Sequence, residues 1–250
     1  MRLAATVMLV RPAARFEVFM LRRSEASHFV PDAYVFPGGT LSESDLSERA
    51  LARLHFDPQA VQQQFRAQPA PGLPSVPRAS AREAEGLLFA ALRELYEEAG
   101  VLFARDATGA AAPTIADESR SDFLKLLETR DLYADASALA FFSQWLTPAQ
   151  FSKRYNTHFF LARARADAVA AADMHETHDG RWIAPADALA RSAAGELHLV
   201  YPTIKHLERL AQFSDCDQLF EFALAKPVLA ITPNTAGDGF ALPAELENAW

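Results

Sequence analysis

Three glutamates near the end of one expected helix, Glu94, Glu97 and Glu98, have the residue type and spacing to bind a cation. At about 100° per residue their side chains share one arc of the helix, turned away from its leucines. Like charges at these spacings cost about 0.2–0.5 kcal/mol per pair, and acids in a last turn oppose the helix dipole. A bound cation would remove both costs, and oxygen ligands without cysteine favour Mg²⁺ or Mn²⁺. The alternative is a solvated acidic face with Arg93 as its counter-ion.

The helix that carries these acids has clear boundary signals. Ser80 and Glu83 have the spacing of a capping box, and Gly100 is placed to end the helix in a left-handed conformation. We therefore expect a helix from about 81 to 99 that buries Leu88, Leu92, Leu95 and Ala99 on its apolar face.

The rest of the chain mixes strand and helix patterns, which predicts an α/β or α+β fold. Short apolar runs predict strands at 3–10, 16–22, 33–36, 101–104, 157–163 and 180–183. Helical patterns occupy 43–67, 117–152 with breaks, 185–194 and 203–225. Residues 68–77 contain four prolines and should form a loop or extended linker rather than a helix. What precedes this loop is too short for its own core, so we expect one domain over 1–250 with an insertion.

Composition limits the classes of partner. The 250 residues carry 24 Lys and Arg against 32 Asp and Glu, a net charge of −8, which argues against a broad nucleic-acid or membrane surface. No apolar run approaches the length of a membrane span, and the first runs read as paired strands rather than a signal peptide. The single cysteine, Cys216, suits a reducing compartment, and we expect the cytoplasm.

The segment Arg93–Val101, R-E-L-Y-E-E-A-G-V, resembles the second half of the Nudix box, R-E-U-x-E-E-x-G-U with U apolar. Phe36–Gly39 resembles the entry to the first half, G-x5-E, whose glutamate position is held by Asp45. Residues 46–92 separate this acid from Arg93, 40 more than the family has there. The resemblance covers about 1–190. It implies a Nudix-type α/β/α sandwich with a mixed sheet, an insertion at about 46–85 inside the box, and a helical C-terminal region at about 196–230.

The resemblance also assigns roles to residues of the box. Glu97 and Glu98 would bind metal, Glu94 would bind metal or act as general base, and the Gly39 carbonyl would complete the shell. Arg93 would orient a glutamate through bidentate hydrogen bonds. Together with Asp45, these acids would meet the divalent ions.

A second acid competes for the role of base. Glu176 lies six residues before Trp182, as a loop glutamate does in the Nudix prototype that cleanses oxidised nucleotides. The nearby His175 and His178 are at i and i+3 rather than the i and i+4 of a zincin, so we do not expect zinc. We expect His158 and His206 to be packed or solvated rather than ligands.

The expected substrate is a small molecule with a diphosphate. Arg23-Ser24 followed by Phe36–Gly39 partly resembles the coenzyme A diphosphatase motif, R-S-x3-R-x3-G-x3-F-P-G-G, although His28 and Asp32 depart from it. The whole layout resembles the branch that contains the mammalian peroxisomal coenzyme A diphosphatase, without its Ser-Lys-Leu ending. Candidate contacts to the phosphates are Arg22, Arg23, Lys153, Arg154 and Arg181.

Several alternatives remain open at the level of sequence. The resemblance does not separate coenzyme A from ADP-ribose, dinucleotides or nucleoside triphosphates. Some Nudix domains bind ligands without cleaving them, although the intact glutamates favour an enzyme. The insertion at 46–85 and the segment 117–152 could cover the substrate or form a homodimer contact.

Overall fold

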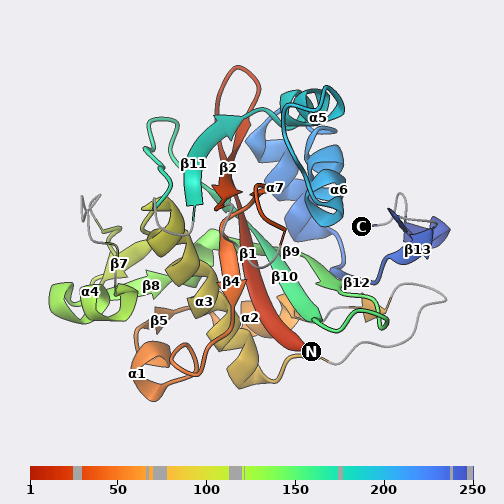
Figure 1. The fold of residues 1–250 in the computed structure, drawn as a ribbon. Coiled ribbons are helices and arrows are strands. Elements are labelled where there is room, and N and C mark those ends of the chain that lie inside the picture. The colour runs from red at the N-terminus through yellow and green to blue at the C-terminus, as the bar shows by residue number, and fades with distance from the viewer. Residues whose placement is uncertain are drawn as a thin grey trace.

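The computed structural model describes residues 1–24, 30–65, 68–69, 78–112, 120, 122–173, 177–236, 239–246 and 250. Its centre is a mixed sheet whose nine strands within these residues are β1 (Arg2–Arg11), β2 (Glu17–Arg23), β3 (Tyr34–Val35), β4 (Gly38–Thr40), β6 (Gln68–Pro69), β9 (Leu139–Leu146), β10 (Tyr155–Arg163), β11 (Thr177–Ile183) and β12 (Leu229–Ile231) (Figure 1). Their order is β11-β2-β1-β10-β9-β12-β6, with β3 beside β2 and β4 beside β1. Strand β10 runs parallel to β1, and β12 runs parallel to β9 and β6.

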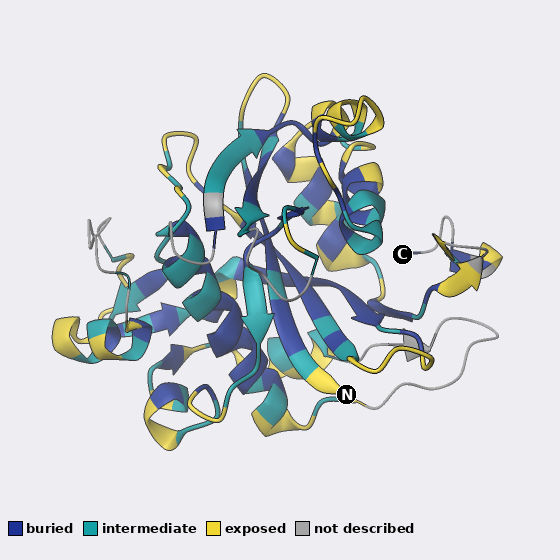
Figure 2. Ribbon diagram, in the orientation of Figure 1, coloured by how far each residue is buried: buried dark blue, intermediate teal, exposed yellow. Residues whose placement is uncertain are grey.

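Helices cover both faces of this sheet (Figure 1). On one face, α3 (Ala81–Ala99) packs against β1, whose Val7 and Leu9 join the same buried cluster. On the other face, α5 (Pro185–Ala193), α6 (Tyr201–Leu210) and α7 (Cys216–Ala225) cover Met8 and Val10. Figure 2 shows buried residues along the central strands and on the inward sides of these helices. Successive side chains of a strand point to opposite faces of the sheet, so alternate residues of β1 pack into the cores on the two faces. The predicted α/β/α sandwich is confirmed.

Helix α3 has the predicted boundaries. The Ser80 N–H donates to Glu83 Oε2 at 2.8 Å, the Glu83 N–H donates to Ser80 Oγ at 3.3 Å, and Ser80 is the N-cap. At the other end Gly100 has φ 72°, a left-handed conformation that costs glycine nothing. The two caps therefore fix where the glutamates of the last two turns lie.

The insertion contains less helix than the polar pattern of 43–67 predicts. It folds as α1 (Glu48–Leu51), β5 (Leu54–His55) and α2 (Pro58–Gln64), which begins at the N-cap Asp57. The loop or extended linker expected from residue 68 begins with two extended residues that form a strand, because β6 pairs with β12. Pro69 is tolerated there because β6 is at the edge of the sheet, where a missing donor leaves no neighbour unsatisfied. Residues 70–77 lie outside the described part of the chain.

The prediction of helix over 117–152 is largely wrong. Among the described residues of this range, α4 (Phe123–Arg130) is the one α-helix, and it is followed by β8 (Leu132–Asp135), the short 3-10 helix η1 (Ala136–Ala138) and β9. All eight residues of β9 are buried, because helices cover both faces of this central strand. Its sequence, L-A-F-F-S-Q-W-L, therefore lacks the apolar–polar alternation that identifies a half-exposed strand, and its polar residues Ser143 and Gln144 are buried with the rest.

The remaining elements form two small sheets and the C-terminal region. Of the strand expected at 101–104 only Ala104 belongs to a strand, β7 (Ala104–Asp106), which joins β8 and β5 in a separate three-stranded sheet. The helix expected over 203–225 is interrupted between α6 and α7, and β12 adds a strand to the region predicted as helical. A hairpin of β13 (Asn234–Ala236) and β14 (Gly239–Ala241), then η2 (Ala244–Leu246), complete the described elements. No described helix combines the length and apolar character needed to cross a bilayer.

Candidate active site

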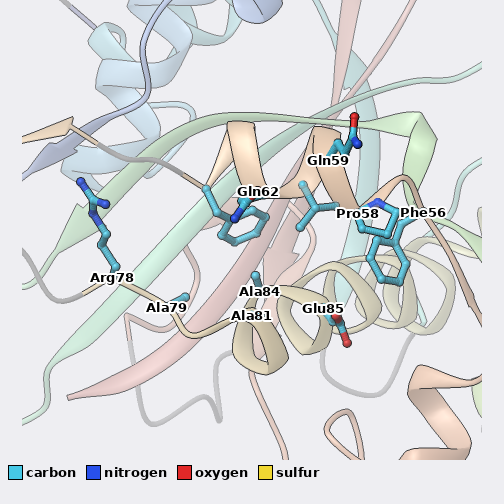
Figure 3. Close-up of a pocket in the computed structure, with 11 residues that line it drawn as sticks. Phe56, Pro58, Gln59, Gln62, Arg78, Ala79, Ala81, Ala84 and Glu85 are labelled. Atoms are coloured by element: carbon cyan, nitrogen blue, oxygen red, sulfur yellow. The ribbon is translucent and has the colours of Figure 1, made fainter.

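A cleft of about 510 Å³ lies where β4 passes the C-terminal half of α3. Its wall combines the backbone of Gly38–Thr40 with charged and polar side chains, among them Arg23, Glu94, Glu97, Glu98, Tyr155 and Asp173. A second cavity, of about 590 Å³, lies between α2 and the first turns of α3 (Figure 3). Its wall is mainly apolar, with Arg78 and Glu85 as its charged residues. Acid–base or metal chemistry therefore belongs to the first cleft, which we call the acidic cleft.

The three glutamates of α3 reach the acidic cleft together, as their helical spacing predicts. The helix buries Leu88, Leu92 and Leu95 in the core and turns the acids to the cleft. The Glu94 side chain keeps 14% of its surface exposed and that of Glu97 keeps 29%. These carboxylates are thus partly shielded from water, so their negative charge destabilises the folded protein unless a cation lies nearby.

Two glycines let β4 approach α3 closely. The Gly38 N–H donates to Glu98 Oε2 at 2.7 Å. A Cβ at Gly39 would lie 2.2 Å from Glu94 Oε1, and a Cβ at Gly38 would lie 2.5 Å from the Ala5 carbonyl oxygen. Side chains at either position would occupy the space between the backbone and the carboxylates.

Arg93 contacts three acids of the box: Asp45, Glu94 and Glu97. Its Nε donates to Asp45 Oδ1 at 2.7 Å and its Nη2 donates to Asp45 Oδ2 at 3.0 Å. Its Nη1 lies 2.9 Å from both Glu94 Oε1 and Glu97 Oε2. The expected bidentate pair is therefore made with Asp45, while each glutamate receives a single contact.

Asp45 does not line the acidic cleft, where we expected it to meet divalent ions together with the glutamates. Its side chain is 1% exposed and it is not among the residues that line the acidic cleft. The Ser42 N–H and Oγ–H also donate to Asp45 Oδ2, at 2.9 and 2.7 Å. Because its lone pairs are directed at Arg93 and Ser42, Asp45 positions Arg93 rather than a metal.

The electrostatics of the cleft follow from this packing. Burial raises the pKa of Glu94 and of Glu97, and Arg93 opposes the rise in both. Burial alone would lower the pKa of Arg93, but Asp45 and the two glutamates reverse this and raise it. The cleft thus has more buried negative charge than Arg93 compensates, which favours an additional cation.

The donor set fits a hard divalent ion. Carboxylate oxygens from Glu94, Glu97 and Glu98 line one cleft with the backbone of Gly39, and oxygen ligands are those that Mg²⁺ and Mn²⁺ prefer. Within the described residues, no three acidic, histidine or cysteine side chains already converge as a preformed metal site. Two of the carboxylates are instead held by Arg93 and the third by Gly38. Binding an ion would therefore require these carboxylates to exchange partners.

Of the arginines expected to contact phosphates, Arg23 lines the acidic cleft, whereas Arg22, Arg154 and Arg181 are not among its lining residues. Arg22 alternates with Arg23 along β2, so it projects from the other face, where its Nε donates to Asp32 Oδ1 at 2.7 Å. Arg181 pairs with Asp179 and lies 4.8 Å from the centre of the Tyr34 ring. Arg154 donates from Nε to the Thr147 carbonyl at 3.3 Å, directly before β10.

The second candidate base, Glu176, lies outside the described residues, as does His175. Asp173, three positions earlier, lines the cleft, and the Thr177 N–H and Oγ–H donate to its Oδ1 at 2.9 and 2.8 Å. No sequence motif marks Asp173, Tyr155 or Thr157, which the fold brings to the cleft. His158 and His206 are buried in the cores, as expected.

Comparison with known proteins adds independent information. The family described as the NUDT19 Nudix domain matches residues 1–210. The acyl-coenzyme A diphosphatase NUDT19 of Homo sapiens is 32% identical over 248 aligned residues, covering 86% of this chain and 66% of the human protein. That of Gallus gallus is 28% identical, covering 90% and 70%. The chain thus spans about two thirds of the length of these relatives.

The fold is also similar to a solved structure. The crystal structure of a NUDIX hydrolase from Alicyclobacillus acidocaldarius superposes with a TM-score of 0.68 at 27% identity. The match covers 91% of this chain and 97% of that one.

Proposed function

The chain belongs to the family of NUDT19 Nudix domains, and we propose that it hydrolyses the diphosphate of coenzyme A or its thioesters. The observation that carries the proposal is the cleft in which Glu94, Glu97 and Glu98 lie beside the glycines of β4. Support for this substrate comes from the names of the relatives, which are acyl-coenzyme A diphosphatases at 32% and 28% identity.

In the proposed reaction, the oxygen of a water molecule forms a bond to one phosphorus of the diphosphate. The bond from that phosphorus to the bridging oxygen breaks, and the bridging oxygen stays with the other phosphate. One water proton passes to the general base and the other is released to solvent, and the products are 3′,5′-ADP and 4′-phosphopantetheine, acylated where a thioester is cleaved.

We propose that Glu97, Glu98, Glu94 and the Gly39 carbonyl hold Mg²⁺ or Mn²⁺. Such an ion neutralises phosphate oxygens and lowers the pKa of the attacking water. Glu94 and Glu176 are alternative acceptors of the water proton. The one whose substitution by glutamine lowers kcat more is the better candidate for the base.

The protein's own groups have distinct parts in this proposal. Arg93, fixed by Asp45, orients Glu94 and Glu97 through its remaining N–H groups. Arg23 lines the same cleft and provides a positive charge for a phosphate of the substrate. A positioned cation and positioned carboxylates need little reorganisation during the reaction, which is the main source of catalysis in phosphoryl transfer.

The test is a panel of diphosphates assayed with Mg²⁺ and with Mn²⁺, with products identified by mass. Coenzyme A, an acyl-coenzyme A, ADP-ribose, a dinucleoside diphosphate and a nucleoside triphosphate would be compared by kcat/KM. We expect coenzyme A or its thioester to have the highest value and to yield 3′,5′-ADP. A higher value for ADP-ribose would refute the proposed substrate, and no turnover of any compound would favour a binding module.

A further inference from the structure

A row of paired residues crosses the sheet from the acidic cleft to an aromatic side chain. Thr40 of β4 pairs with Ala4 of β1, Ala4 pairs with Thr157 of β10, and Thr157 pairs with Trp145 of β9. The first three residues line the acidic cleft. Adjacent strands lie about 4.8 Å apart and paired residues project from the same face. Trp145 therefore stands beside the wall of the cleft, one strand further along.

From Trp145 a chain of aromatic rings leads to the surface. The ring centre of Trp145 lies 6.3 Å from that of Tyr201, which lies 5.6 Å from that of Phe240. Phe240 lies 5.7 Å from Phe151. These rings come from β9, the start of α6, β14 and the loop between β9 and β10. Gln150 Nε2 donates to Thr235 Oγ1 at 3.1 Å, which ties that loop to the C-terminal hairpin.

The outer two rings of this chain are exposed. Phe151 is 41% exposed and Phe240 is 37% exposed, and they are the two exposed phenylalanines among the described residues. Single exposed apolar residues need no explanation, but here two segments 89 positions apart bring their exposed aromatic rings into contact. The contact leaves ring surface available to a flat ligand.

Charge beside the rings indicates the kind of ligand. Lys153 and Arg154 follow Phe151 in the same loop. Arg154 Nε donates to the Thr147 carbonyl, and neither side chain forms an ion pair with a carboxylate in the described part of the chain. Tyr155, the next residue, lines the acidic cleft, so the chain between it and Phe151 spans at most about 14 Å. Exposed aromatic rings next to cations are the combination that binds a nucleotide, since the base stacks and the phosphate is neutralised. An acyl chain is uncharged, so it would not pair with the cations.

We propose that Phe151 and Phe240 form a stacking platform for the purine of the substrate's nucleotide half, with Lys153 and Arg154 beside its ribose phosphate. The inference rests on the proposed function, which supplies a substrate with a purine and a 3′-phosphate. Phe240 lies beyond residues 1–210, the part matched by the family, so the platform depends on a C-terminal hairpin outside the shared domain.

The test measures binding of the product half without requiring turnover. 3′,5′-ADP would be titrated by calorimetry into the wild-type protein, F151A, F240A and the aromatic variant F151W. The control is L224A, which removes a side chain that is 66% exposed on α7, away from these rings. We expect Kd to rise at least 10-fold in F151A and F240A, and to stay within twofold of wild type in F151W and L224A. F151A changes only an exposed loop residue, so it keeps the test valid if F240A loosens the hairpin.

Two results would overturn the platform: no binding of 3′,5′-ADP by the wild type, or equal binding by wild type and F151A. A parallel titration with 4′-phosphopantetheine is expected to give the same Kd in all variants. A selective loss of that ligand in F151A would instead assign the rings to the pantetheine arm and contradict the proposal. Failure of the wild type to cleave coenzyme A would refute the proposed function alone, because the binding comparison is independent of cleavage.

Discussion

Replacing Asp45 by asparagine tests whether this buried acid positions Arg93 rather than binding metal. The substitution keeps the size of the side chain but removes its charge and exchanges one acceptor oxygen for an NH₂ donor. Both carboxylate oxygens accept from Arg93, and Oδ2 also accepts from Ser42, so the new NH₂ group would face a donor in either orientation. The side chain is 1% exposed, so water cannot compensate for the loss.

The magnitude follows from the partners that Arg93 retains. Breaking a buried ion pair costs about 3–5 kcal/mol when the remaining charge is uncompensated. Arg93 keeps its contacts to Glu94 and Glu97, so we expect a smaller loss, about 2–3 kcal/mol of unfolding free energy. For a chain of this length that corresponds to a decrease of roughly 5–10 °C in Tm. Activity should fall about 10- to 100-fold, as it does when a residue that orients metal ligands is removed.

The assay is thermal unfolding in the presence of EDTA, followed by Mg²⁺-dependent kinetics. D167N is the matched control, because Asp167 forms the same two hydrogen bonds with Arg165 but is 71% exposed. Its Tm should not change measurably, since exposed ion pairs contribute little. A D45N protein as stable as D167N without metal, but with weakened Mg²⁺ affinity, would refute the positioning role and make Asp45 a ligand.

Three further predictions concern single side chains. G39A should fold, because its new Cβ meets only the movable end of Glu94, but its kcat should be at least about 10-fold lower than that of wild type. G38A should unfold at a lower temperature than G39A, because its Cβ meets backbone atoms. Equal Tm values for the two variants would contradict this prediction. At pH 8 in EDTA, the Tm of E97Q should be no lower than that of wild type, because burial raises the pKa of Glu97 and so disfavours its charged form in the folded protein. A clearly lower Tm for E97Q would instead show that the Glu97 carboxylate stabilises the fold. Burial lowers the pKa of His206 to about 3, so as the pH decreases the unfolded state binds a proton before the folded state does. The unfolding free energy should therefore fall between about pH 6.5 and pH 3, by at most about 5 kcal/mol. Denaturant titrations at several pH values should show a steeper dependence of unfolding free energy on pH for wild type than for H206F, and parallel dependences would contradict the prediction.

Sequence patterns predicted the elements whose burial is periodic. The helix of the glutamates was marked by its two caps and its leucines, and β1, β2 and β10 were marked by short apolar runs with turns between them. The Nudix box identified the acids of the cleft although 40 extra residues interrupt it. These features are local, so they can be recognised before the fold is known.

What the sequence could not predict depends on contacts between distant segments. The sequence of β9 predicts a helix because both faces of this strand are buried, and β6 is a strand through its pairing with β12. Asp45 carries the same charge as a metal ligand, and only its burial against Arg93 separates the two roles. Likewise, Arg22 and Arg23 are neighbours of the same type, and the pleat of β2 alone decides which one lines the cleft.

The central claim is that the glutamates of α3 make the acidic cleft a metal-dependent diphosphatase. Its most direct test is the initial rate of 3′,5′-ADP release from coenzyme A with Mg²⁺, measured for wild type and E98Q. The glutamine can still accept the Gly38 N–H, so the fold and Tm should be retained. We predict Mg²⁺-dependent release by wild type and a rate at least about 100-fold lower for folded E98Q, beyond the loss expected for a residue that only orients a ligand. Equal rates for the two proteins would contradict the assignment of this cleft as the active site.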